Sequence, residues 1–95
     1  MEIPEEQKRI KDNLAVIRLY LTSKFPDHTI TEAAVPSLYH KFTVTNHTQY
    51  TRYKLKVSWP RLSDRSNTPE HTRSALDSGN VASGMMQIGD NDYYW

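Results

Sequence analysis

The stretch LYHKFTVTNHTQYTRYKLKVSW, residues 38–59, alternates apolar and polar residues on both sides of a polar centre. Alternation with a period of two is typical of a half-buried β-strand, because successive side chains point to opposite faces of a sheet. The central NHTQ, residues 46–49, is rich in turn-forming residue types. The stretch therefore predicts a β-hairpin of two antiparallel strands.

The two faces of this hairpin differ in chemistry. The face predicted to be buried carries His40, Phe42, Val44, Tyr53, Leu55 and Val57. The opposite face carries four cations and an aromatic ring, in Tyr39, Lys41, Arg52, Lys54 and Lys56. Cations neutralise phosphates and rings stack on bases, so this basic face is a candidate binding face for nucleic acid or another polyanion. The alternative is an ordinary solvated strand surface, on which lysine is favoured because it opposes aggregation.

A long helix is predicted before the hairpin, from about Pro4 to Lys24. Its apolar residues recur every three or four positions and so form one stripe. The stripe consists of Ile10, Leu14, Ile17 and Leu21. A short strand is expected between this helix and the hairpin, at His28–Glu32. This strand would add a third member to the sheet.

Two short helices are predicted after the hairpin. The first has Thr68 at the N-cap position, Pro69 at the first helical position and Gly79 beyond its end. The second spans Val81 to Gln87. Three consecutive aromatics follow near the end of the chain, Tyr93, Tyr94 and Trp95. We expect them to dock on the body as a last strand or as a hydrophobic lid.

Together these elements predict an α+β fold in a single domain, residues 1–95. It consists of an N-terminal helix, an antiparallel sheet of two to four strands around the central hairpin, and one or two short C-terminal helices packed on one sheet face. A chain of 95 residues is long enough for one core. The second sheet face is left to solvent or to a partner.

Charge is distributed unevenly along the chain. Residues 25–65 carry six cations and three carboxylates, a net charge of +3, whereas residues 66–95 carry one cation and four carboxylates, a net charge of −3. The acidic segment is able to lie over the basic hairpin face and neutralise it. The sequence alone leaves open whether that face is available to a ligand.

The order helix, three strands, helix resembles that of double-stranded-RNA-binding domains, and YHKFTV, residues 39–44, is similar to their His-x-Phe-Thr-Val stretch. The resemblance implies a lysine-rich phosphate clamp at the start of the second helix. Here that segment is TPEHTRSAL, residues 68–76, with one acid, one arginine and no lysine. We therefore do not assign the chain to that family.

The spacing of Ala75, Gly79, Met85 and Ile88 is similar to that of a helix-turn-helix motif. The resemblance implies a recognition helix in NVASGMMQIG, residues 80–89. That segment carries no cation to contact DNA and contains Gly84, a poor helix former. We interpret the region as two short helices that meet at a glycine.

No motif for catalysis or metal binding is present in the sequence. There is no cysteine, no two of the four histidines are three or four positions apart, and no glycine-rich phosphate loop occurs. We predict a non-enzymatic domain without metal, cofactor or catalytic residues.

No apolar run approaches the ~20 residues of a membrane span. MEIPEEQKRI at the start lacks a secretory pattern, so we expect a cytoplasmic protein without membrane contact.

The favoured prediction is a small interaction domain that associates with a protein partner or with a second copy of itself as a homodimer. The chain has two tryptophans, six tyrosines and a Met85–Met86 pair, and the sheet is expected to have an open edge. Aromatics and methionine are common at interface centres. Tyr93, Tyr94 and Trp95 are the candidate interface aromatics. Nucleic-acid or polyanion binding through the basic face is the alternative.

Overall fold

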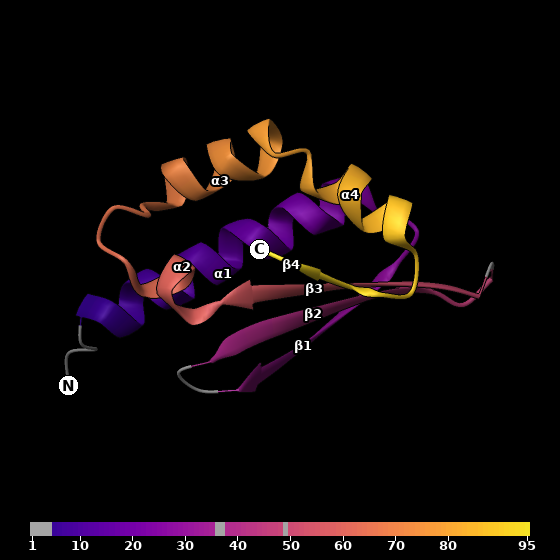
Figure 1. Ribbon diagram of the computed structural model, residues 1–95, viewed down its shortest axis with the longest axis horizontal. Helices are drawn as coiled ribbons and strands as arrows, with labels where there is room; N and C mark the ends of the chain where they lie inside the picture. Colours follow the sequence, from indigo (N-terminus) through magenta and orange to yellow (C-terminus); the bar gives the residue numbers. More distant parts are fainter. Residues whose placement is uncertain (1–4, 36–37, 49) are drawn as a thin grey trace.

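The computed structural model describes residues 5–35, 38–48 and 50–95. One sheet with the strand order β1-β2-β3-β4 carries the helices on one face and leaves the other face open (Figure 1). In chain order the elements are α1 (Glu5–Lys24), β1 (Thr29–Val35), β2 (Tyr39–Asn46), β3 (Thr51–Ser58), α2 (Trp59–Ser63), α3 (Pro69–Ser78), α4 (Val81–Ile88) and β4 (Asp92–Tyr94). The predicted α+β architecture, with its N-terminal helix and central hairpin, is confirmed.

The register of the hairpin is the one that the alternation predicts. Phe42 lies opposite Leu55, and Lys41 lies opposite Lys56. The side chains on the core face, Phe42, Val44, Leu55 and Val57, are fully buried beneath the helices. The basic side chains consequently share the face that points away from the helices.

The fourth strand differs from the prediction in its direction. β4 runs parallel to β3, with Leu55 opposite Tyr93 and Lys56 opposite Tyr94, so the sheet is mixed rather than antiparallel. The cause is the connection: α2, α3 and α4 all pass over the helical face before the chain returns to the edge of β3 (Figure 1). A crossover of this kind brings the chain back in a parallel direction.

Several predicted boundaries need correction. β3 ends at Ser58 rather than Trp59, and a short helix, α2, begins at Trp59 with Pro60 in its first turn. Proline fits there because a first-turn residue needs no N–H partner within the helix. β1 extends to Val35, three residues beyond the predicted end. Pro4 and Gln49, the expected first helical residue and last turn residue, lie outside the described residues.

The helices are tied to each other through buried polar groups. Tyr20 of α1 is almost wholly buried, and its hydroxyl accepts a hydrogen bond from Ala82 N at the start of α4, at 3.1 Å. Asn13 of α1 is fully buried, and its amide nitrogen donates to Leu62 O in α2 and to Asn67 O in the segment between α2 and α3. Thr68 caps α3 as predicted, since its hydroxyl accepts from His71 N. Within the described ranges, no helix combines the length and hydrophobicity needed to cross a membrane.

Candidate functional site

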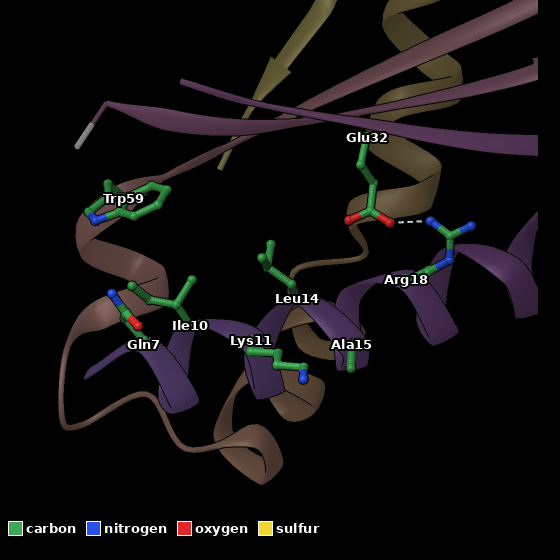
Figure 2. A pocket seen from close by; sticks show the side chains of 8 residues that line it. All are labelled: Gln7, Ile10, Lys11, Leu14, Ala15, Arg18, Glu32 and Trp59. Carbon is green, nitrogen blue, oxygen red and sulfur yellow. Dashed lines mark hydrogen bonds and ion pairs between the residues drawn. The ribbon is translucent and has the colours of Figure 1, made fainter. Parts of the chain in front are cut away.

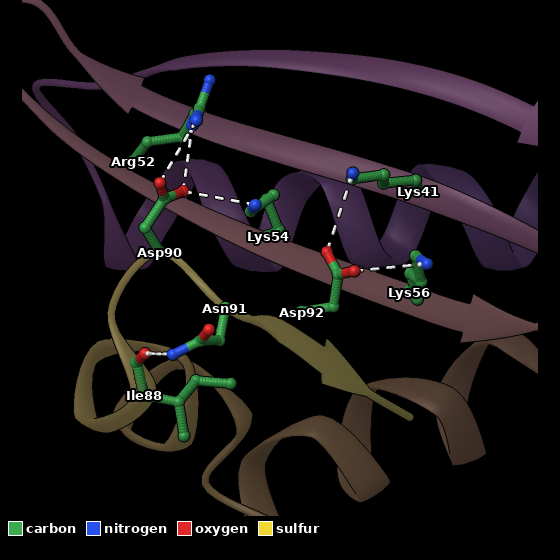
Figure 3. A network of polar contacts seen from close by, with 8 residues as sticks. All are labelled: Lys41, Arg52, Lys54, Lys56, Ile88, Asp90, Asn91 and Asp92. Atoms are coloured by element: carbon green, nitrogen blue, oxygen red, sulfur yellow. Dashed lines mark hydrogen bonds and ion pairs between the residues drawn. The ribbon is translucent and has the colours of Figure 1, made fainter.

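The outer face of the sheet brings the predicted basic residues together. Arg52, Lys54 and Lys56 follow one another along β3, and Lys41 projects beside them from β2 (Figure 3). Lys54 and Lys56 are largely covered, with side-chain exposures of 20% and 19%, whereas Arg52 is 54% exposed. Other groups of the chain therefore cover Lys54 and Lys56.

The covering group is the acidic segment that precedes and begins β4. Asp90 accepts hydrogen bonds from Arg52 Nε and Nη2 at 3.0 and 3.2 Å, and its Oδ1 lies 3.3 Å from Lys54 Nζ. Asp92 lies 3.2 Å from Lys56 Nζ and 3.6 Å from Lys41 Nζ (Figure 3). Each carboxylate thus bridges two cations, and we call these six residues the ion-pair ladder.

The ladder lowers the pKa of both of its carboxylates. The hydrogen bond from Arg52 lowers the pKa of Asp90 to about 2, and Lys54 adds to the effect. Desolvation opposes ionisation of Asp92, but the hydrogen bond from Lys56 and the charge of Lys41 outweigh it and lower the pKa. The same hydrogen bond raises the pKa of Lys56. Four cations facing two carboxylates leave the ladder with a modest positive excess.

Acid is expected to loosen β4. The pKa of Asp90 and Asp92 is lower in the folded chain than in an unfolded one, so their contribution to stability is present above about pH 4. It is lost as the pH falls through the folded pKa, about 2 for Asp90. Amide resonances of β4, followed by NMR during an acid titration, should shift towards values typical of unfolded chain before those of β2. In a double variant, Asp90→Asn with Asp92→Asn, the β4 amides should already be less protected from hydrogen exchange at pH 6 than in the parent. Equal acid responses in the variant and the parent would contradict the ladder's role.

A pocket of about 520 Å³ lies at one end of the sheet, where β2 begins and β3 and β4 end. We call it the aromatic pocket. It unites Tyr39 and Lys56 from the predicted basic face with Tyr94 and Trp95 from the predicted interface aromatics. Its lining residues are Leu38, Tyr39, Lys56, Ser58, Arg61, Tyr94 and Trp95. The two candidate sets therefore meet in one place.

Cations hold the rings of this pocket in position. Lys56 Nζ lies 4.7 Å from the ring centre of Tyr39 and 5.4 Å from that of Tyr94. Arg61 stacks on Trp95, with 4.1 Å between Cζ and the ring centre. Such cation–π contacts orient aromatic side chains at exposed sites. The backbone is fixed as well, because Trp95 N donates to Lys56 O at 2.8 Å and Trp95 O accepts from Ser58 N at 3.1 Å.

The surface of the pocket combines exposed apolar side chains with a cation, Arg61, that has no acidic partner among the described residues. Tyr94 is 73% exposed and Leu38 is 63% exposed. Lys56 is already paired with Asp92, whereas no carboxylate among the described residues lies within ion-pair distance of Arg61. The pocket is consequently suited to a group that is apolar in part and acidic in part.

Tyr93 does not belong to this surface. It lies opposite Leu55 on the helical side of the sheet and packs against the core. A Cβ atom on Gly84 of α4 would lie only 2.5 Å from Tyr93 Cε2. Tyr93 is thus an anchor that holds β4 down, and the alternation of the strand presents Tyr94 on the other face.

Three pocket residues were absent from the sequence prediction: Leu38, Ser58 and Arg61. Arg61 belongs to α2, a five-residue helix that the spacing of apolar residues did not predict. Leu38 and Ser58 flank the hairpin at its open end, and Trp59 N donates to Leu38 O at 3.1 Å. The sequence could have indicated Leu38 and Ser58 only through the hairpin itself, because residues at the open end of a hairpin are neighbours.

The histidines show no arrangement for metal binding. Where the structure describes the chain, no three His, Asp or Glu side chains gather closely enough to hold a metal ion. His40 is buried, and its Nε2 lies 3.0 Å from Glu32 Oε1, so it is a hydrogen-bonded core histidine.

Comparison of the chain with protein-family models, with curated proteins and with solved structures gives no match, so only its own residues bear on its function.

Proposed function

We propose that the chain is a small non-catalytic interaction domain that binds a protein partner at the aromatic pocket. The observation that supports this best is the clustering of exposed Tyr94 and Leu38 with Tyr39, Trp95 and Arg61. Aromatic residues and arginine are enriched at the centres of protein interfaces, where they form most of the energetically important contacts. Their rings are pre-positioned, so little side-chain freedom is lost on binding.

The chemistry of the pocket defines what the partner should present. Leu38 and Tyr94 offer apolar surface, which suits an aliphatic or proline side chain. Arg61 offers a guanidinium without a carboxylate partner among the described residues, which suits Asp or Glu. A volume of about 520 Å³ accommodates a few side chains. The proposed ligand is therefore a short segment that joins an apolar residue to an acidic one.

Binding of nucleic acid through the outer face is the less favoured alternative. A phosphate approaching Lys54 or Arg52 competes with Asp90, and one approaching Lys41 or Lys56 competes with Asp92. Displacing a bound carboxylate offsets much of the attraction that the cation offers. Phosphate contacts otherwise dominate such binding and strengthen as salt falls.

Peptide selection tests the proposal. A library of random peptides of about 12 residues is selected on the full chain, and bound peptides are measured against Tyr94→Ala and Arg61→Glu. We expect enriched peptides to pair an apolar or proline residue with an acid, and to bind at least tenfold more weakly to both variants, roughly 1.4 kcal/mol. Tyr50→Ala is the matched control, because Tyr50 is 92% exposed in the turn between β2 and β3 and lies outside the pocket.

Two outcomes would overturn the proposal. One is a selected peptide set that binds Tyr94→Ala as tightly as the parent. The other is binding of mixed oligonucleotides at low salt that is lost in Lys54→Glu with Lys56→Glu, since that result supports the polyanion alternative instead.

A further inference from the structure

A groove of about 480 Å³ separates α1 from the β1 edge of the sheet (Figure 2). The residues that line it are Gln7, Ile10, Lys11, Leu14, Ala15, Arg18, Glu32 and Trp59. Trp59 stands at one end, and the ion pair of Arg18 with Glu32 stands at the other. Ile10, Leu14 and Ala15 make the wall between them largely aliphatic. The groove shares no lining residue with the aromatic pocket, although Trp59 directly follows Ser58 of that pocket.

β1 provides an open backbone edge beside the groove. Among the described strands β1 pairs with β2 alone, so one row of its N–H and C=O groups faces outward. Exposed strands are usually protected by charges, above all lysine, along the edge. Within Thr29–Val35 the one charged residue is Glu32, and its side chain turns to the helical face, where Arg18 and His40 hold it. The edge is therefore unprotected by charge.

We propose that an extended segment of a different protein adds to this sheet as a further strand along β1. The main chain of the added strand would bond to the open edge, and alternate side chains would point to the helical face and enter the groove. A sheet edge lying next to a helix-lined groove supplies both parts of this recognition. The backbone bonds provide affinity, and the groove selects the side chains.

A second copy of the chain is the less suitable occupant. Antiparallel pairing of β1 with itself about a two-fold axis matches residues symmetrically around the strand's midpoint, which is Glu32 in Thr29–Val35. Full overlap then sets Glu32 directly opposite the same residue of the copy, on the same face. Like charges directly opposite each other destabilise a strand pair. Shifting the register avoids this clash only by shortening the overlap.

Charge indicates the chemistry of the occupant. Lys11 stands exposed on the α1 wall of the groove, and within the described part of the chain no carboxylate pairs with it. Glu32 already pairs with Arg18, so it offers no free carboxylate to a cation of the added segment. The groove therefore offers a free cation above an aliphatic wall. Along the added strand, every second side chain faces α1. Among these side chains, the segment that fits the groove has Val, Ile or Leu and one Glu or Asp.

The test uses the full chain and synthetic nine-residue peptides. The probe places Val and one Glu on the side chains of a single strand face and Thr on the other. A second peptide has alternate backbone nitrogens methylated, which blocks strand pairing but keeps every side chain. A third has Lys in place of the Glu. Binding is followed by NMR shifts of β1 and α1 resonances.

We expect the probe to shift resonances of β1 and of α1 around Leu14, and the methylated peptide to bind at least tenfold more weakly. Lys11→Glu should weaken probe binding at least fivefold, and the lysine peptide should restore it. Lys8→Glu is the matched control, because Lys8 is exposed on α1 but does not line the groove. Arg61→Glu should have no effect, which separates this inference from the proposal for the aromatic pocket.

The inference is overturned by any of four results. The probe and its methylated form bind equally; the probe leaves β1 resonances unchanged, or loses affinity in Arg61→Glu and so occupies the aromatic pocket; or sedimentation shows a dimer whose formation shifts β1 resonances, which makes a second copy the occupant.

Discussion

Replacing Asn13 by leucine is expected to lower the free energy of unfolding by about 2–4 kcal/mol. The Asn13 side chain is fully buried in α1, and its amide makes three hydrogen bonds. Nδ2 donates to Leu62 O at 3.0 Å and to Asn67 O at 2.8 Å, and Oδ1 accepts from Thr72 Oγ1 at 2.9 Å. Leucine has a similar shape but leaves these three groups without their partner. Urea denaturation followed by circular dichroism measures the loss.

Thr72→Val measures the contribution of a single hydrogen bond of Asn13, because it removes one of the three and keeps the shape of the side chain at position 72. We expect it to cost about 1 kcal/mol. The larger loss in Asn13→Leu should also reach the aromatic pocket, since Asn67 Nδ2 donates to Arg61 O at 2.8 Å and Asn13 holds the Asn67 backbone. An Asn13→Leu variant as stable as the parent would show that the network does not hold α2 and α3 to α1.

The position of Asn13 was visible in the sequence, although its role was not. It lies three residues after Ile10 and four before Ile17, so it falls on the same apolar stripe of the helix. A polar residue on a buried stripe needs hydrogen-bond partners. Those partners lie 49 to 59 residues further along the chain, beyond the range of any local pattern.

The parts of the fold that the sequence predicted are those determined by local periodicity. Alternation determined the register of β2 with β3, and the three- and four-residue spacing identified α1. The parallel direction of β4 was missed because three residues, Asp92–Tyr94, are too few to show a pattern and their direction depends on the path of the helices before them. The charge distribution raised the possibility that the acidic segment lies over the basic face, but it left the question open, and the pairing of each carboxylate with two cations required the structure.

Replacing Gly84 by valine is expected to displace Tyr93 and with it β4. A Cβ at this position would lie 2.5 Å from Tyr93 Cε2 and 3.0 Å from Cζ, closer than non-bonded atoms approach, so the ring has to move. We expect a loss of about 1–3 kcal/mol, as is usual for overpacking. Thermal or urea denaturation checks this value. Gln87→Val, on the exposed side of α4, is the matched control for the helix propensity of valine.

A second substitution distinguishes a steric clash from other causes. Tyr93→Leu shortens the side chain that meets Gly84, so Gly84→Val should cost less in a Tyr93→Leu background than in the parent. Additive losses in the double variant would contradict the contact.

Gly84→Val should also affect the two proposed binding surfaces differently. Tyr93 anchors β4, which positions Asp92 beside Lys56 and leads into Tyr94 and Trp95 of the aromatic pocket. When the anchor is displaced, peptide binding at that pocket should fall at least tenfold even at temperatures where the chain remains folded. Binding along β1 should persist, because β2 and β3 lie between β1 and β4. An equal loss at both surfaces would instead indicate that Gly84→Val disrupts the whole sheet.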